Sequence, residues 1–149
     1  MLNQSHPYHV LFICTGNACR SQIAEGWANH LGGAILEARS AGIEAHGQNP
    51  RAIAVMREAS VDITAQTSKK LDDTLLTWAD LVITVCGHAD EHCPMLPARV
   101  TKQHWPLSDP AKAQGTSEEI MSVFRATRDD IRNRVTAIIT QLAQSRGKK

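Results

Sequence analysis

A cysteine, a tight turn, an arginine and a hydroxyl follow one another in the segment CTGNACRS, residues 14–21. Cys14 opens the segment, Arg20 comes six positions later, and Ser21 follows directly. A cysteine supplies a nucleophilic sulfur, and an arginine supplies a planar fork of donors that fits two oxygens of a tetrahedral oxyanion. This spacing is therefore typical of a site in which a thiolate attacks a bound oxyanion.

The residues between the cysteine and the arginine suit an anion-binding loop. Gly16 and Asn17 tolerate the left-handed backbone conformations that turn successive N–H groups towards one ligand. The positive field of such a loop favours the thiolate form of Cys14, and Ser21 is placed to donate a hydrogen bond to that sulfur. We expect the oxyanion to be held by Thr15, Gly16, Asn17, Ala18, Cys19 and Arg20.

The elements on either side of the loop support this interpretation. The apolar run HVLFIC at residues 9–14 predicts a buried strand, and an apolar stripe at helical spacing predicts a helix over residues 21–31. A helix N-terminus that follows a tight loop favours bound anions. The alternative is an ordinary strand-to-helix turn with a buried cysteine, and the position between strand and helix favours the anion loop over it.

Strands and helices alternate along the rest of the chain. The sequence predicts further strands and helices at residues 34–40, 50–59, 81–85, 100–105 and from 116 onward. This alternation predicts an α/β fold: a single three-layer domain over residues 1–149, with a four-stranded parallel sheet covered by helices on both faces. In the expected strand order 2-1-3-4, Cys14 and Cys86 lie side by side at the carboxyl edge, where such sheets bind ligands.

Composition excludes several classes of function. Lys and Arg number 16 against 15 Asp and Glu, so the sequence predicts no nucleic-acid-binding surface. No apolar stretch reaches membrane-spanning length, and the first ten residues lack a signal-peptide pattern, so we expect no membrane association and a cytoplasmic location. Thiols are kept reduced there, and the four cysteines are then more typical of catalytic, redox or metal sites than of a disulfide framework.

Other interpretations of these residues carry less weight. A zinc site could explain the cysteines, but the spacings from Cys14 to Cys19 and from Cys86 to Cys93 are loose for structural zinc, so we expect no metal. Cys19 is expected to serve packing apart from its place in the loop. His46 has two interpretations, a histidine that approaches the oxyanion site or a solvated histidine, and we expect the second.

The segment at residues 14–21 resembles the phosphate loop of the low-molecular-weight protein tyrosine phosphatase superfamily. Ser108-Asp109-Pro110 resembles that family's aspartate loop, which implies that Asp109 is the general acid. Tyrosine phosphatases of this fold usually carry aromatic residues after the Asp-Pro pair, whereas this chain has Ala111-Lys112-Ala113.

A more specific resemblance comes from residues 10–27, 40–50 and 82–94 taken together, which resemble the thioredoxin-coupled arsenate reductases of that superfamily. The resemblance implies a thiol relay that reduces arsenate to arsenite in arsenic detoxification. It implies a monomer without a tightly bound cofactor, with phosphate or sulfate as competing oxyanions. The alternative is a low-molecular-weight protein tyrosine phosphatase that hydrolyses phosphomonoesters.

The implied relay uses three cysteines in turn. Cys14 attacks arsenate while Asp109 protonates the oxygen that leaves as water, and Cys86 then attacks the Cys14 sulfur and releases arsenite. Cys93 next attacks Cys86, and thioredoxin reduces the resulting redox-active Cys86–Cys93 disulfide. In the phosphatase alternative, Cys14 alone forms a phosphoenzyme.

The relay constrains the segment from Cys86 to Cys93. If residues 86–93 were helical, the two end Cα atoms would lie roughly 10 Å apart, whereas a disulfide needs about 7 Å or less. The segment is therefore predicted to be a loop, or to unwind on oxidation.

Family members often hold a potassium ion near the anion loop. Asn17, Glu25 and Ser40 match three of its ligand positions, and Lys69 aligns with the fourth, which is an acid in the family pattern. We expect the ammonium group of Lys69 to replace the cation and stabilise Glu25, and activity to be indifferent to potassium.

Overall fold

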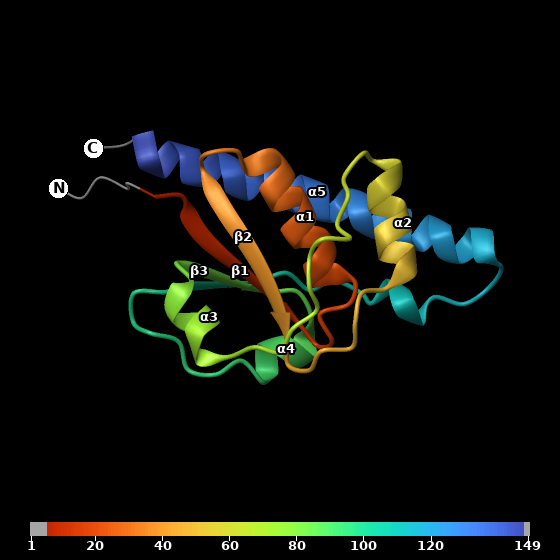
Figure 1. Ribbon diagram of the computed structural model, residues 1–149, viewed down its shortest axis with the longest axis horizontal. Helices are drawn as coiled ribbons and strands as arrows, with labels where there is room; N and C mark the ends of the chain where they lie inside the picture. Colours follow the sequence, from red (N-terminus) through yellow and green to blue (C-terminus); the bar gives the residue numbers. More distant parts are fainter. Residues whose placement is uncertain (1–5, 148–149) are drawn as a thin grey trace.

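A single parallel sheet organises the chain (Figure 1). The computed structural model describes residues 6–147. The prediction of a cytoplasmic location depends in part on residues 1–5, which lie outside this range. The strands are β1 (Tyr8–Cys14), β2 (Leu36–Gly42), β3 (Leu81–Thr84) and β4 (Thr101–His104). They pair in parallel in the order β2-β1-β3-β4. The predicted α/β class and strand order are confirmed.

Helices cover both faces of this sheet. On one face α1 (Arg20–Gly32) packs against α5 (Ser117–Gly147), and α2 (Pro50–Glu58) packs against α5 beside it (Figure 1). The short helices α3 (Asp73–Trp78) and α4 (Gly87–Glu91) lie on the side of the sheet away from α5 (Figure 1). This arrangement is required because a parallel sheet joined by right-handed crossovers is buried on both faces.

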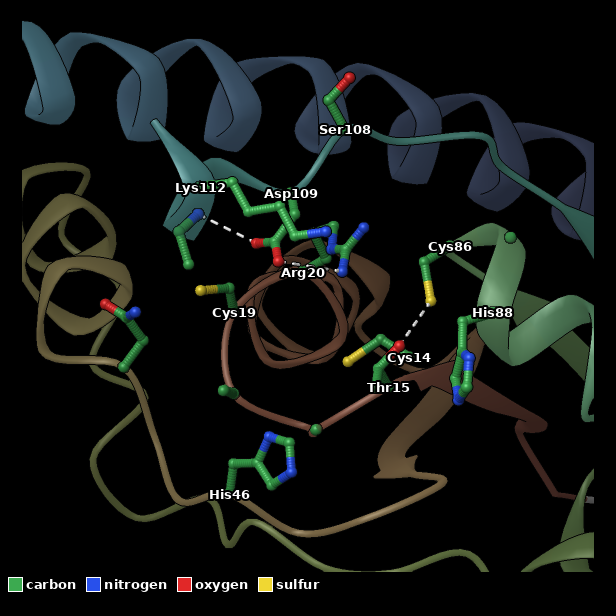
Figure 2. A pocket seen from close by; sticks show the side chains of 15 residues that line it. Cys14, Thr15, Cys19, Arg20, His46, Cys86, His88, Ser108, Asp109 and Lys112 are labelled. Carbon is green, nitrogen blue, oxygen red and sulfur yellow. Dashed lines mark hydrogen bonds and ion pairs between the residues drawn. The ribbon is translucent and has the colours of Figure 1, made fainter. Parts of the chain in front are cut away.

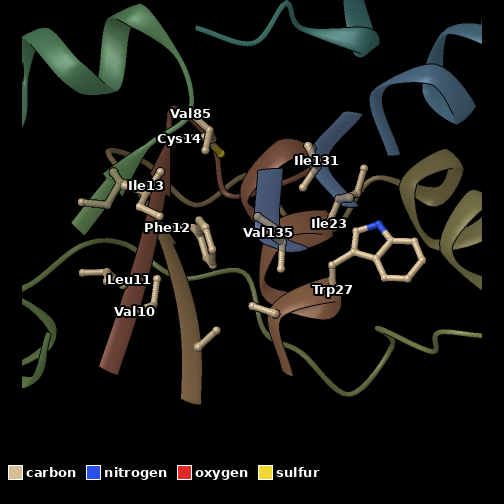
Figure 3. Close-up of a cluster of buried hydrophobic side chains, with 14 of the residues drawn as sticks. Val10, Leu11, Phe12, Ile13, Cys14, Ile23, Trp27, Val85, Ile131 and Val135 are labelled. Atoms are coloured by element: carbon tan, nitrogen blue, oxygen red, sulfur yellow. The ribbon is translucent and has the colours of Figure 1, made fainter. Parts of the chain in front are cut away.

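The core explains why β1 is a continuous apolar run. Its residues 10–14 are all buried, because both faces of the central strand are covered. Phe12 faces Ile23 of α1 and the buried residues Ile131 and Val135 of α5 (Figure 3). The indole N–H of Trp27 on α1 donates to the carbonyl oxygen of Arg128 on α5 at 3.1 Å. Apolar burial and this hydrogen bond together fix α1, and with it the loop that α1 begins.

The long C-terminal helix begins with a capping box. The backbone N–H of Thr116 donates to Glu119 Oε1 at 2.8 Å, and the backbone N–H of Glu119 donates back to Thr116 Oγ1 at 3.1 Å. Only one stripe of α5 is buried, as expected for a surface helix. Within residues 6–147, no helix has the length and apolar character needed to cross a membrane.

The second strand begins two residues later than the sequence predicts. Gly33 adopts a left-handed conformation with φ of 54°, and the N–H of Ile35 donates to the carbonyl oxygen of Gly32 at 2.9 Å. These residues therefore complete a turn after α1 before the chain enters the sheet.

Neither α3 nor α4 is predicted as a helix by apolar periodicity. Each is defined instead by a capping side chain: Asp72 accepts a hydrogen bond from Leu75 N at 2.9 Å, and Cys86 Sγ accepts one from Ala89 N at 3.3 Å.

Candidate active site

A cavity of about 590 Å³ opens at the carboxyl ends of β1 and β3 (Figure 2). This volume lies within the range usual for small-molecule sites. Cys14 lines it from the end of β1 and Arg20 from the start of α1. Cys86 lines it from the segment after β3, and Asp109 from the segment after β4. Four of the residues singled out by sequence thus face one cavity, at the edge of the sheet where α/β proteins bind ligands.

The loop between β1 and α1 is shaped as the sequence predicts at Asn17 but not at Gly16. Asn17 adopts a left-handed conformation with φ of 50°, and its backbone N–H donates to Cys14 Sγ at 3.2 Å. Gly16 has no left-handed φ, so that prediction is wrong. Glycine is required there for space, because a Cβ at residue 16 would lie 2.3 Å from Nδ1 of His46.

The Cys14 sulfur accepts a hydrogen bond whose direction is fixed by its neighbours. Ser21 Oγ lies 2.8 Å from Cys14 Sγ. The side-chain amide of Asn17 donates to Ser21 Oγ at 2.8 Å and to Ser40 Oγ at 2.9 Å. Each hydroxyl therefore accepts from Asn17 and directs its own hydrogen elsewhere. Ser21 donates to the sulfur, which stabilises the thiolate form.

The orientation of the Asn17 amide is itself fixed. Its oxygen accepts from the backbone N–H of Lys69 at 2.9 Å and from Gln22 Nε2 at 3.2 Å, which leaves only the nitrogen to face the two serines. Asn17 is fully buried and does not line the cavity. The structure thus places Asn17 behind the loop, where its amide supports the sulfur, whereas the sequence counts it among the oxyanion-binding residues.

The other end of this hydrogen-bond chain is a buried carboxyl group. Ser40 Oγ donates to Glu25 Oε1 at 2.5 Å. Burial is the largest effect on Glu25 and raises its pKa, while the hydrogen bond from Ser40 and the charge of Lys69 lower it. The Lys69 ammonium lies 3.4 Å from the carbonyl oxygen of Thr67 and acts on Glu25 through its charge.

A potassium ion fits these residues poorly. The Asn17 oxygen that would serve as a ligand already accepts two hydrogen bonds. The hydroxyl of Ser40 donates a hydrogen bond to the carboxyl oxygen of Glu25, so these two oxygens are also engaged. The Lys69 ammonium adds positive charge nearby.

Arg20 and Asp109 lie next to each other in the lining of the cavity (Figure 2). Arg20 Nη1 donates to the carbonyl oxygen of Leu107 at 3.0 Å, and Arg20 Nη2 lies 3.7 Å from Asp109 Oδ2. The other Asp109 oxygen caps the short 3-10 helix η1 (Pro110–Lys112) by accepting from Ala111 N at 2.9 Å. The guanidinium and the carboxyl group are thus both anchored, and both are available to a bound oxyanion.

The second cysteine lies beside the first, and the third lies outside the cavity. Cys86 Sγ is 3.3 Å from Oγ1 of Thr15, the residue that follows Cys14 (Figure 2). Cys93 lies beyond α4, is half-buried, and does not line the cavity. All four cysteines are free thiols. In this reduced state residues 87–91 are helical, so the predicted rearrangement requires α4 to unwind.

Cys19 lines the cavity but is a poor nucleophile. Burial, followed by the negative charge of Asp109, raises its pKa to about 12. Cys19 therefore remains a thiol at neutral pH, whereas the reactive form of cysteine is the thiolate.

His46 lines the cavity from the segment after β2. The backbone N–H of Glu44 donates to the carbonyl oxygen of Thr15, and that of His46 to the carbonyl oxygen of Gly16, both at 2.8 Å. These bonds continue the pairing of β1 with β2 beyond the sheet and bring His46 to the cavity. The His46 side chain is 54% exposed, so the expectation of a solvated histidine is confirmed, and it also lines the cavity, as the alternative had it. The available signal was its place just after a strand that pairs with β1. Asn49, His88 and Lys112 also line the cavity.

Comparisons with known proteins show which proteins this chain is similar to. An arsenate reductase of Oceanobacillus iheyensis is 53% identical over 126 residues, which cover 85% of this chain and 91% of the relative. A solved arsenate reductase in the phosphate binding state matches with a TM-score of 0.75 and 33% identity, covering 91% of this chain and 98% of the other.

A second solved structure, the thioredoxin-dependent arsenate reductase of Corynebacterium glutamicum, matches with a TM-score of 0.76 and 30% identity. This match covers 95% of this chain and 65% of the other. Residues 9–148 match the low molecular weight phosphotyrosine protein phosphatase family, and the chain belongs to this family.

Proposed function

We propose that this protein reduces arsenate to arsenite through a relay of three cysteines and passes the oxidising equivalents to thioredoxin. The observation that carries the proposal is the placement of two reduced cysteines, Cys14 and Cys86, on one cavity that also presents Arg20 and Asp109. Hydrolysis of an ester needs one nucleophile, whereas reduction of an oxyanion needs two electrons, which a pair of thiols supplies by forming a disulfide.

The first step forms a sulfur–arsenic bond. Arg20 and the loop N–H groups hold arsenate above Cys14, whose thiolate is stabilised by Ser21 and by the N–H of Asn17. The thiolate attacks arsenic, and Asp109 gives its proton to the oxygen that leaves as water. Arsenic remains in its pentavalent state in this adduct.

The second step is the reduction. Cys86 loses its proton and attacks the Cys14 sulfur, which breaks the sulfur–arsenic bond. The bonding electron pair stays with arsenic, which becomes trivalent and leaves as arsenite. The two cysteines are oxidised to a Cys14–Cys86 disulfide. Thr15, 3.3 Å from the Cys86 sulfur, is placed to hold this second nucleophile in position.

The third step moves the disulfide outward. Cys93 attacks Cys86, the Cys14 thiolate is released, and a redox-active Cys86–Cys93 disulfide remains for reduction by thioredoxin, a dithiol. No tightly bound cofactor takes part. The proposed enzyme is a monomer of the reducing cytoplasm, and phosphate or sulfate competes with arsenate because each has a similar shape and charge.

The family description favours one alternative, hydrolysis of phosphomonoesters through a Cys14 phosphoenzyme. Cys14, Arg20 and Asp109 are sufficient for that chemistry. Ala111 and Lys112 line the cavity after Asp109, however, and provide no aromatic wall for a phenol ring. We therefore propose hydrolysis as a weak side activity.

A coupled assay separates these functions. Wild-type protein is mixed with thioredoxin, thioredoxin reductase, NADPH and arsenate, and NADPH oxidation and arsenite release are followed together. The wild type should turn over many times, Cys93→Ser should release about one arsenite per protein, and Cys86→Ser should release none. Cys19→Ala, which keeps the three relay cysteines, is the matched control and should turn over. Ester hydrolysis that is unaffected by losing Cys86, without NADPH oxidation, would instead establish a phosphatase.

A further inference from the structure

An ion pair joins β4 to α4, the helix that lies between Cys86 and Cys93 in the sequence. Lys102 Nζ on β4 lies 2.7 Å from Asp90 Oδ1 on α4, and Thr84 Oγ1 on β3 lies 3.3 Å from the same oxygen. Asp90 belongs to the segment between Cys86 and Cys93, which must unwind in the proposed relay. Lys102 belongs to the sheet, paired in register with β3. The ion pair thus connects α4, which must move in the proposed relay, to the sheet, which stays in place.

Both members of this pair also act on Cys93, which follows Asp90 by three residues. Burial is the largest effect and raises the pKa of Cys93. The ammonium of Lys102 lowers this pKa and the carboxylate of Asp90 raises it. His104, the next titratable group on β4, acts on the carboxylate of Asp90. The two charges that shift Cys93 therefore oppose each other, while the ion pair keeps them together.

The relay itself would separate these charges. Asp90 leaves with α4 when residues 86–93 unwind, whereas Lys102 remains on β4 with a flexible four-carbon side chain. Besides Asp90, the group whose negative charge raises the pKa of Lys102 is Cys93. Loss of the Asp90 carboxylate therefore leaves the ammonium to act on the sulfur of Cys93. Only the thiolate attacks a disulfide, so a cation near this sulfur favours the attacking form.

We propose that Lys102 is a positioning residue that favours the attack of Cys93 on Cys86, and that Asp90 neutralises the charge of Lys102 until residues 86–93 unwind. This inference rests on the proposed relay and concerns its third step alone. In that step Cys93 loses its proton to water and attacks the Cys86 sulfur of the Cys14–Cys86 disulfide. One sulfur–sulfur bond breaks, another forms, and Cys14 leaves as a thiolate without net oxidation.

The test uses full-length reduced protein and needs no arsenate. The rate at which iodoacetamide modifies Cys93 is measured by peptide mass spectrometry as a function of pH. Asp90→Asn should raise the rate at neutral pH about twofold or more, and Lys102→Met should lower it by a similar factor, as expected for partly exposed charge pairs. Lys102→Arg, which keeps the cation, should react like the wild type.

The two substitutions should change the alkylation rate in opposite directions, and this separates an electrostatic effect on Cys93 from a purely structural role of the ion pair. Either single substitution breaks the ion pair. If the pair only held α4 against β4, both Asp90→Asn and Lys102→Met would expose Cys93 and raise its alkylation rate alike. That result would overturn the inference, as would unchanged rates in both variants. The double variant should return close to the wild-type rate.

A second experiment measures the step itself. After reduced protein is mixed with arsenate and quenched at intervals, the conversion of Cys14–Cys86 into Cys86–Cys93 disulfide should be slowed by Lys102→Met and restored by Lys102→Arg. Arsenite release, which precedes this step, should be unchanged in a single turnover. Equal conversion rates in the wild type and Lys102→Met would refute the inference with the relay intact. If the wild type forms no Cys86–Cys93 disulfide at all, the proposed function fails, and the alkylation rates still report whether the charges act on Cys93.

Discussion

Ser21 directs its only hydroxyl hydrogen at the sulfur of Cys14. The two atoms lie 2.8 Å apart, and Asn17 already donates to the serine oxygen, so the hydrogen cannot point towards the amide. A backbone N–H of the loop reaches the same sulfur at 3.2 Å. The sulfur therefore receives two hydrogen bonds before any oxyanion binds, and both stabilise its anionic form more than its neutral form.

Replacement of Ser21 by alanine should slow the reactions of Cys14. A hydrogen bond to a charged group contributes about 1.5–3 kcal/mol, so the rate of Cys14 alkylation at neutral pH should fall about tenfold or more. Ser40→Ala is the matched control, because it removes the other hydroxyl bonded to Asn17 without touching the sulfur. Equal reactivity of Cys14 in Ser21→Ala and wild-type protein would contradict this role of the hydroxyl.

The sequence predicts those parts of the site that depend on local pattern. The apolar run before Cys14, the helix that begins at Arg20 and the spacing between them are all encoded within some twenty residues, and the strand order follows from right-handed crossovers. Cys86 is positioned by the same sheet, because it follows the strand that pairs with β1.

Other parts depend on contacts between distant segments. His46 reaches the cavity because residues 43–46 pair with the loop after β1, a contact between two segments that are distant in the sequence. The helix α4 is too short to show apolar periodicity, and its cap is a cysteine sulfur, an acceptor that is not among the usual capping groups. The orientation of the Asn17 side-chain amide depends on a hydrogen bond from the backbone of Lys69, 52 residues away.

Cys19 should be dispensable for chemistry. Its pKa of about 12 leaves almost no thiolate at neutral pH, so Cys19→Ala should retain the wild-type turnover number and destabilise the fold by about 1 kcal/mol, as is typical when a buried methyl-sized group is removed. Turnover in the coupled assay and urea denaturation measure the two effects. A loss of turnover in folded protein as large as that of Cys14→Ser would show that Cys19 belongs to the relay.

The buried carboxyl group of Glu25 should make stability depend on pH. Because burial raises its pKa above the ordinary value of 4.5, the folded state holds this proton more tightly than the unfolded chain does. Stability is therefore lost as the pH rises from about 4.5 through the raised value. Glu25→Gln removes this loss and keeps an oxygen acceptor for Ser40, so its stability relative to the wild type should increase between pH 4 and pH 8.

Urea denaturation at several pH values checks this relation. The control is Glu37→Gln, which removes an exposed carboxylate from the strand that carries Ser40. A constant stability difference between Glu25→Gln and the wild type across this pH range would show that Glu25 does not change its protonation as described.

Oxidation should unwind α4. Residues 87–91 are helical in the reduced protein, and the end-to-end span of a helical segment from Cys86 to Cys93 is too long for a disulfide. Hydrogen exchange of the α4 amides should therefore accelerate at least tenfold on oxidation, while β1 and β3 remain protected. Identical exchange of α4 in the reduced and oxidised forms would contradict the rearrangement.

The central claim is that arsenate oxidises the cysteines to disulfides in a fixed order. Reduced protein is mixed with excess arsenate and no external reductant, alkylated, and mapped by mass spectrometry for protected cysteines. The account predicts a Cys86–Cys93 disulfide with arsenate but none with phosphate, and free Cys14 and Cys19. Four free thiols after arsenate treatment would contradict it and leave a phosphatase whose additional cysteines take no part in the reaction.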